Sequence, residues 1–173
     1  VRKLPAGHTL SFEQAACSIR SFWDVPNPAC SLALAEVSQE VSSLINEAVK
    51  DRLVSDVPLG AFLSGGIDSS FVVSLMSRLL PEPVKTFSVG FEDPSRNELP
   101  HARVVARQLR TDHREIVLKT CSPDLVERVV WHLDEPVADP AVLPTLLLAD
   151  LARQHVTVVL TGEGGDELFG GYS

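Results

Sequence analysis

The sequence lacks long apolar runs, cysteine pairs and an excess of basic residues. No apolar run in its 173 residues approaches the roughly 18 that a membrane-spanning helix needs, so we expect no membrane insertion. The 15 Lys and Arg are outnumbered by 23 Asp and Glu, and the net charge of −8 argues against a nucleic-acid-binding surface. The three cysteines lack metal-ligand spacing, which predicts reduced thiols in a cytoplasmic protein.

The apolar content, 45% of the residues, is enough for one globular core. Residues 1–30 hold short β-like pieces interrupted by proline and glycine. From Ser31 apolar residues recur at helical spacing, which predicts a long amphipathic helix with Ser31 as its N-cap. We therefore expect a domain boundary near residue 30. The chain starts without Met and stops just after a Gly-Gly pair, so we expect a fragment of a longer enzyme.

After this helix, apolar strand-like runs alternate with helical patterns. Strands are expected at 57–63, 84–91, 114–118 and 156–161, and helices at 69–80, 98–109, 123–133 and 143–154. This rhythm predicts an α/β fold with a parallel sheet covered by helices on both faces. Ligands bind beyond the carboxyl ends of the strands in such sheets, so we expect the chemistry just after Leu63, Val89 and Leu160.

The strongest signal is a seven-residue segment between an expected strand and an expected helix, Ser64-Gly65-Gly66-Ile67-Asp68-Ser69-Ser70. Its first three residues can turn tightly and direct N–H groups at an anion, and its last two add hydroxyl donors at the positive end of a helix dipole. The segment therefore predicts a polyphosphate cradle. Phosphate repels Asp68 unless a cation lies between them, which predicts a Mg²⁺ ligand. The segment is not a Walker-type loop, because it lacks the Gly-Lys-Ser/Thr ending of such loops. The alternative to a phosphate-binding role is a generic strand–turn–helix connection.

A second segment, acidic and rich in glycine, follows the last expected strand as Thr161-Gly162-Glu163-Gly164-Gly165-Asp166-Glu167-Leu168-Phe169-Gly170-Gly171-Tyr172. It would face the first segment across the carboxyl edge of the sheet, with glycines that let backbone approach a ligand. Asp166 could complete a Mg²⁺ site with Asp68. Taken alone, the segment is also compatible with a glycine-rich turn bearing solvated carboxylates.

Both segments resemble those of a known enzyme family. The first is similar to the pyrophosphate-binding loop of ATP pyrophosphatases, and the second to the Ser/Thr-Gly-Glu/Asp-Gly-x-Asp-Glu-x-Phe-Gly-Gly-Tyr stretch of asparagine synthetases. The resemblance implies an adenine nucleotide α-hydrolase-like, Rossmann-like fold with a five-strand-type sheet, truncated here at the C-terminus. It implies that ATP and Mg²⁺ serve to adenylate a carboxylate with release of pyrophosphate, and that ammonia then displaces AMP.

The resemblance also implies roles for single residues. Main-chain groups expected to meet the adenine or ribose of ATP are those of Phe62, Leu63, Val89, Thr161 and Gly162. The first three are equally compatible with plain strand core. Glu163, expected near the α-phosphate, could act as acid or base in the ammonia step. The five histidines, His113 among them, are expected to be structural or surface residues.

Residues 1–24 resemble the end of the family's N-terminal glutaminase domain. We therefore expect residues 1–30 to be a glutaminase tail and linker, and residues 31–173 to be the N-terminal part of the synthetase domain. A glutaminase domain would then be a partner in the longer protein, for which a homodimer stays open. The glutaminase uses an N-terminal cysteine, and residue 1 here is Val, so we expect no glutaminase site in this chain.

The acceptor is the least defined part of the resemblance. Residues 133–145 depart from the hydroxyl and arginine residues credited with holding aspartate in the best-known bacterial enzymes. They resemble instead a branch with members that amidate or cyclise other carboxylates. Aspartate is the first expectation, and another carboxylate, as in β-lactam synthetases or lasso-peptide cyclases, is the alternative. A third reading is an inactive nucleotide-binding fragment.

Overall fold

The computed structural model describes residues 2–26, 33–118, 122–133, 137 and 139–171. The chain divides into two compact units, Val1–Glu40 and Val41–Ser173. The first unit contains an antiparallel hairpin of β1 (His8–Glu13) and β2 (Ala16–Ser21). Gln14 and Ala15 join the strands with φ angles of 50° and 62°, the double positive φ of a tight hairpin turn. The predicted β-like pieces are therefore one hairpin, whose turn lacks the glycine that usually signals it.

The predicted long helix is α1, Leu34–Arg52, which runs from the first unit into the second. Its start is marked by the Ala33 N–H, which donates to Glu36 Oε2 at 3.0 Å. The expected N-cap, Ser31, lies outside the described residues. In the second unit Val49 of α1 is buried, and Ile45 and Leu53 pack beside it against the core. None of the helices in the described residues combines the length and the apolar character that crossing a membrane would require.

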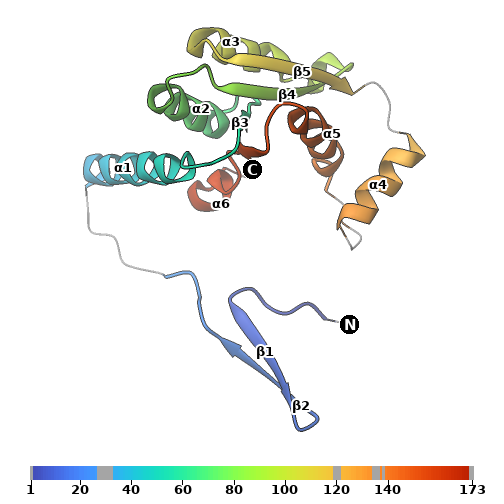
Figure 1. Cartoon of the computed structure of the whole chain (residues 1–173). Coiled ribbons are helices and arrows are strands. Elements are labelled where there is room, and N and C mark those ends of the chain that lie inside the picture. The colour runs from blue at the N-terminus through green and yellow to red at the C-terminus, as the bar shows by residue number, and fades with distance from the viewer. Residues whose placement is uncertain (1, 27–32, 119–121, 134–136, 138, 172–173) are drawn as a thin grey trace. The chain divides into compact units, whose positions relative to one another are not determined.

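The second unit is built on a parallel four-stranded sheet with the order β5-β4-β3-β6 (Figure 1). The strands are β3 (Leu59–Phe62), β4 (Lys85–Phe91), β5 (Asp112–Leu118) and β6 (Val158–Leu160). Ala61 of β3 lies in register between Thr86 of β4 and Leu160 of β6. The α/β class and the parallel sheet are confirmed. Strand order reverses between β3 and β6, and such switch points are where parallel sheets leave a crevice at their carboxyl edge.

The remaining helices match the predicted pattern closely. They are α2 (Ile67–Leu79), α3 (Leu99–Leu109), α4 (Pro123–Leu133), α5 (Val142–Arg153) and the short α6 (Gly165–Phe169), with a 3₁₀ turn at Pro94–Arg96. Helix α2 begins two residues before its predicted start. The five-residue α6 replaces the turn predicted there. Its flanking residues Gly164 and Gly170, with φ of 94° and 71°, stop it at both ends, so it is too short to show a helical period.

Helices cover both faces of the sheet, as predicted, because strand side chains point alternately to opposite faces. Ala61 and Leu63 belong to a core that includes residues of α1, α2 and α3. The neighbouring Phe62 packs against a second core formed by Phe87, α5 and Val156. Figure 1 shows α2 and α3 on one side of the strands and α5 on the other. Two cores hold the carboxyl ends of β3, β4 and β6 in place.

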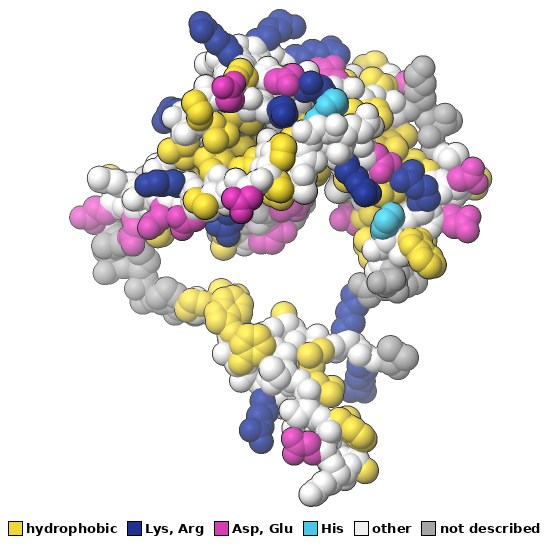
Figure 2. Space-filling view, viewed as in Figure 1, with side chains coloured by type: hydrophobic (Ala, Val, Ile, Leu, Met, Phe, Trp, Pro, Cys, Tyr) yellow, Lys and Arg dark blue, Asp and Glu magenta, His cyan; other side chains and the backbone are white. Residues whose placement is uncertain are grey.

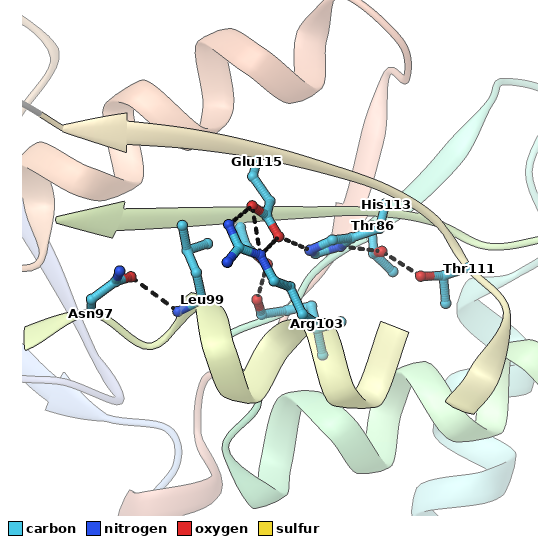
Figure 3. Close-up of polar contacts among 9 residues, drawn as sticks. Thr86, Asn97, Leu99, Arg103, Thr111, His113 and Glu115 are labelled. Atoms are coloured by element: carbon cyan, nitrogen blue, oxygen red, sulfur yellow. Dashed lines mark hydrogen bonds and ion pairs between the residues drawn. The ribbon is translucent and has the colours of Figure 1, made fainter. Parts of the chain in front are cut away.

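A polar network fastens α3 to the sheet (Figure 3). Arg103 of α3 binds Glu115 of β5 through two nitrogens, with Nη2–Oε2 at 2.7 Å and Nε–Oε1 at 2.8 Å. His113 Nε2 lies 3.2 Å from Glu115 Oε1, and His113 Nδ1 lies 2.9 Å from the hydroxyl of buried Thr86. The Thr86 hydroxyl also contacts that of Thr111, at 2.8 Å. The network holds α3 in a fixed position, and the N-terminal end of α3 borders the site described below.

Environment shifts the ionisation of this network. The hydrogen bond from Arg103 lowers the pKa of Glu115, and the same bond raises the pKa of Arg103. Burial lowers the pKa of His113, although Glu115 acts in the opposite direction. The folded protein therefore favours neutral His113. Its positions beside Thr86 and Glu115 give His113 a structural role, one of the two roles that the sequence left open.

Replacement of His113 by glutamine is expected to alter the pH dependence of stability. At pH 7.5 we expect a loss of about 1–3 kcal/mol, because Thr86 loses its ring partner. Below pH about 6.5 the unfolded parent takes up a proton that folded His113 resists, so the parent loses stability on acidification. His113→Gln lacks this loss, and the difference between the two should shrink at pH 5.5. Urea unfolding at both pH values measures it. A difference that stays constant or grows would contradict the assignment.

Candidate functional site

A cavity of about 270 Å³ opens at the carboxyl edge of the sheet, beside the switch point between β3 and β6. Most of the residues predicted for the site line it: Phe62, Leu63, Ser64, Gly66, Asp68, Ser69, Val89, Thr161, Gly162, Glu163 and Asp166. Two predicted residues, Gly65 and Ser70, do not. The fold therefore brings together two segments that lie almost 100 residues apart in the chain.

The first segment is held in shape by its own serines. The hydroxyls of Ser64 and Ser69 lie 3.0 Å apart, and the Gly66 N–H donates to Ser64 Oγ at 3.2 Å. The Ser64 N–H donates to Ser69 Oγ at 3.3 Å. These bonds use two of the N–H groups that the sequence predicted for an anion. The donors left to a ligand are the first N–H groups of α2, which have no partner four residues earlier in the helix.

Helix α2 directs its positive end into the cavity. Its N-cap is Gly66, which has no side chain, so no side-chain oxygen caps the N–H groups of the first turn. Asp68 and Ser69 follow in that first turn, and both line the cavity. Ser70 lies deeper, and its buried hydroxyl has no hydrogen-bond partner in the described residues. An unpaired helix start favours a bound anion through its free N–H groups and its dipole.

Gly65 connects the first segment to α3 rather than to the cavity. Its φ is +87°, and a Cβ atom added there would lie 2.5 Å from Ala102 N and 2.6 Å from His101 C. Only glycine tolerates both the backbone conformation and this approach to main-chain atoms. Gly65 therefore sets the distance between the loop and α3.

Gly65→Ala is expected to destabilise the protein by at least about 1–3 kcal/mol, because it combines backbone strain with a clash against α3. Gly66→Ala is the matched control. Gly66 has φ of −68°, and its added Cβ would contact only Ser64 Oγ, at 3.3 Å. Urea unfolding of both variants is the measurement. Equal losses in the two would show that Gly65 has no special role in packing.

The strand ends serve both as core and as wall. Leu63 is 1% exposed, its N–H donates to Phe87 O at 2.9 Å, and its carbonyl accepts the hydroxyl of Ser88. The backbone of Leu63 can therefore form one more hydrogen bond, through the second lone pair of its carbonyl oxygen. Phe62 and Val89 are half-buried and pack against the second core. Packing and cavity lining therefore coexist at all three positions.

The second segment packs directly on the first through its glycines. A Cβ added to Gly162 would lie 2.8 Å from Ser69 N, and one added to Gly165 would lie 2.6 Å from Asp68 Cγ. The sequence predicted that these glycines let backbone approach a ligand. The structure shows that Gly162 and Gly165 let backbone approach the first segment. Gly164, at φ +94°, has no neighbour there within 4 Å and acts as a turn residue.

Carboxylates dominate the lining of the cavity. The acidic lining residues are Asp68, Glu98, Glu163, Asp166 and Glu167, and none of the lining residues that the structure describes is Lys, Arg or His. The Glu163 N–H donates to Thr161 Oγ1 at 3.4 Å, which ties Glu163 to the end of β6. Within the described ranges no group of three or more His, Cys, Asp or Glu is arranged as a metal site. A phosphate chain could enter this negative field only with cations beside it.

Sequence reasoning missed several lining residues. These are Glu98, Thr145 and Leu148, whereas Gly164 and Glu167 also line the cavity and belong to the second segment, in which no individual role was predicted for them. Glu98 ends the connection after β4 and could have been found from that position at the carboxyl edge. Thr145 and Leu148 come from α5, whose apolar pattern predicts core and carries no ligand signal. Only the packing of α5 against β4 brings them to the cavity.

Residues 40–173 match the asparagine synthase family. The chain belongs to this family. It is 46% identical over 139 residues to "Asparagine synthetase [glutamine-hydrolyzing] 1" of Bacillus subtilis, a match that covers 78% of this chain and 21% of the relative. It is 39% identical over 174 residues to "Putative asparagine synthetase [glutamine-hydrolyzing] 2" of Methanocaldococcus jannaschii, covering 98% of this chain and 34% of the relative.

Another relative carries a different name. "Amidase chyE" of Penicillium rubens is 34% identical over 191 residues, which cover 99% of this chain and 28% of the relative. The chain thus spans between 21% and 34% of the length of these three relatives.

A solved structure supports the fold. The NH3-dependent NAD synthetase of Campylobacter jejuni superposes with a TM-score of 0.51 at 19% identity, over 78% of this chain and 60% of that one. At this identity the likeness concerns the fold alone. It agrees with the parallel α/β arrangement and with the fold class that the two segments predicted.

Proposed function

We propose that this family member is part of an ATP-dependent amide-forming ligase, in which residues 31–173 are the N-terminal part of the synthetase domain. It adenylates the side-chain carboxylate of aspartate and transfers ammonia to it, giving asparagine, AMP and pyrophosphate. The observation that carries the proposal is the contact between the two segments at one cavity. Gly162 and Gly165 pack against Ser69 and Asp68. The N-terminus of α2, which is suited to bind phosphate, and the acidic residues of the second segment therefore line the same cavity.

The nucleotide would lie with its phosphates at the start of α2. Free N–H groups there and the hydroxyl of Ser69 offer donors to oxygens of a leaving pyrophosphate. The wall formed by Phe62, Leu63 and Val89 would take the adenine or ribose, and Thr161 and Gly162 would flank it. Positioning of the α-phosphate against the acceptor carboxylate supplies most of the rate in such a transfer.

Magnesium fits the donor set of this cavity. Oxygen ligands are what Mg²⁺ prefers, and in nucleotide sites it is held by one or two carboxylates together with phosphates and water. Asp68 and Asp166 line the same space and would be these carboxylates. Among the described residues the lining carries five acids and no basic side chain, so a cation beside the phosphates of ATP would offset their repulsion from these acids. When bound, Mg²⁺ neutralises charge that develops on the leaving pyrophosphate.

Glu163 is the proposed acid or base of the ammonia step. It lines the cavity just after the end of β6, three positions before the proposed metal ligand Asp166. From that position its carboxylate can accept a proton from ammonia as the amide forms. Ammonia would come from a glutaminase domain of the longer protein, of which residues 1–30 would be the tail and linker.

The acceptor itself has a second candidate. The relative named an amidase is 34% identical over 99% of this chain, so the same fold segment occurs in enzymes that carry other names. Another carboxylate therefore stays the alternative to aspartate. Thr145 and Leu148 of α5 line the cavity, and Thr145 belongs to the region, residues 133–145, in which the sequence departs from the aspartate-binding pattern.

Pyrophosphate release from Mg-ATP with a panel of carboxylates tests the proposal. We expect release that depends on aspartate, with an aspartyl adenylate detected by mass spectrometry. If pyrophosphate is released with another acid but not with aspartate, that acid is the acceptor and the proposed adenylation chemistry still holds. Binding of Mg-ATP by calorimetry without release with any acid would identify an inactive nucleotide-binding module.

A further inference from the structure

A second cleft lies at the other end of α3 from the candidate site. Its volume is about 280 Å³. We name it the arginine cleft, and its lining residues are Arg103, Ala106, Arg107, Arg110, Thr111 and His113. The helix meets the first segment at Ala102, and about 12 Å of helix separates Ala102 from Arg110. The arginine cleft is therefore a separate feature.

Arg103 and Arg107 lie one turn apart on α3, and Arg110 follows at the C-cap of the helix, and all three line the same cleft. Glu115 neutralises Arg103 through the paired hydrogen bonds of the polar network. In the described ranges, no ion pair or hydrogen bond engages the guanidinium of Arg107 or Arg110. No carboxylate is among the described residues that line it, although the whole chain carries a net charge of −8. Figure 2 shows basic side chains gathered over α3 in the second unit.

The floor of the arginine cleft is fixed by hydrogen bonds. The Thr111 N–H donates to Ala106 O at 3.0 Å, and the Thr111 hydroxyl contacts buried Thr86. The imidazole of His113 is held by Thr86 on one side and Glu115 on the other. A fixed floor reduces the ordering entropy that binding would otherwise cost. Two free cations on a fixed floor are suited to an anion.

Favourable interaction with the helix dipole accounts for only part of this arrangement. Basic residues in the last turn stabilise a helix, and Arg107 fits that role. Arg110, however, lies beyond the helix in a left-handed conformation with φ of 54°. Its backbone N–H donates to Arg107 O at 3.3 Å, so the residue caps the helix and does not continue it. The dipole favours a cation at both positions, but it does not by itself account for the cleft that the two side chains share.

We propose that the arginine cleft binds a small phosphate-bearing anion through the guanidinium groups of Arg107 and Arg110. Guanidinium forks match phosphate oxygens in pairs and stay charged at any physiological pH. The small volume and the acidic remainder of the surface disfavour an extended nucleic acid. This site is independent of the proposed ligase function.

Titration of the 173-residue chain with inorganic phosphate at constant ionic strength tests the proposal, with the Thr111 amide followed by NMR. We expect a saturable shift of that signal. Arg107→Gln combined with Arg110→Gln should weaken phosphate binding at least about tenfold. Arg52→Gln combined with Arg78→Gln removes the same charge from exposed positions on α1 and α2, and should change the affinity less than about twofold.

A third variant separates charge from geometry. Arg107→Lys combined with Arg110→Lys keeps the charge and loses the fork, so we expect intermediate affinity. A linear, unsaturated response of Thr111 would overturn the proposal, as would equal affinity in the parent and the double glutamine variant. Tighter binding of a single-stranded oligonucleotide than of phosphate at the same positions would assign the arginine cleft to nucleic acid and would also overturn it.

Discussion

Asp68→Asn and Asp166→Asn are each expected to reduce Mg-dependent pyrophosphate release to below about 1% of the parent rate. Both side chains line the cavity in which the phosphates are proposed to lie. Asparagine keeps the shape of aspartate, so the contact of residue 68 with Gly165 is retained. The change removes the negative charge that a Mg²⁺ ion needs from its ligands. Calorimetry with Mg-ATP and a pyrophosphate release assay measure the effect.

Asp51→Asn is the control for this pair, because Asp51 is exposed on α1 and lies outside the cavity. Its activity and its ATP affinity should match those of the parent. Thermal unfolding should place all three variants within a few degrees of the parent. If either cavity variant binds ATP with unchanged affinity and unchanged dependence on Mg²⁺, the shared metal site is wrong.

Glu163→Gln is expected to lower amide formation by about 10²-fold or more while ATP affinity stays near that of the parent. The substitution keeps the size of the side chain, and the hydrogen bond from residue 163 to Thr161 is made by the main chain and is retained. What it removes is the proton-accepting carboxylate. The measurement compares amide formation with ATP binding in the longer protein that contains this chain.

Glu82→Gln, at an exposed position outside the cavity, is the charge-matched control. It should leave amide formation and ATP affinity unchanged. Loss of ATP binding equal to the loss of turnover in Glu163→Gln would make Glu163 part of the nucleotide cradle. Activity within a few-fold of the parent would identify it as a solvated carboxylate on a turn. Either outcome removes the proposed catalytic role.

Local patterns predicted the order and type of most elements. The β4 and β5 runs and the helical periods of α3 and α4 are strong enough that their positions follow within a few residues. Elements with weak local signals were missed. Helix α6 is too short for a period, and the β1–β2 turn uses Gln14 and Ala15 in a conformation that glycine or asparagine normally adopts.

The meeting of the two segments was also predictable from the sequence, because parallel strands place their carboxyl ends at one edge. That rule placed Asp68 and Glu163 in one cavity without any knowledge of side-chain contacts. The rule says nothing of which atoms face the ligand. The interpretation of the two segments directed Gly65 and the later glycines at the ligand, whereas Cβ atoms added to Gly65 and Gly165 would meet α3 and Asp68.

Family, fold class and the two motif segments were thus determined by the sequence alone, because they depend on local composition and on spacing along the chain. Tertiary structure decided what depends on contacts between distant residues. It placed Thr145 and Leu148 in the wall of the cavity and joined Thr86, His113 and Glu115 into one network. It also gathered the arginines of α3 beside Thr111. Such contacts depend on how helices pack on the sheet, and no pattern within a single segment determines which residues of different elements meet.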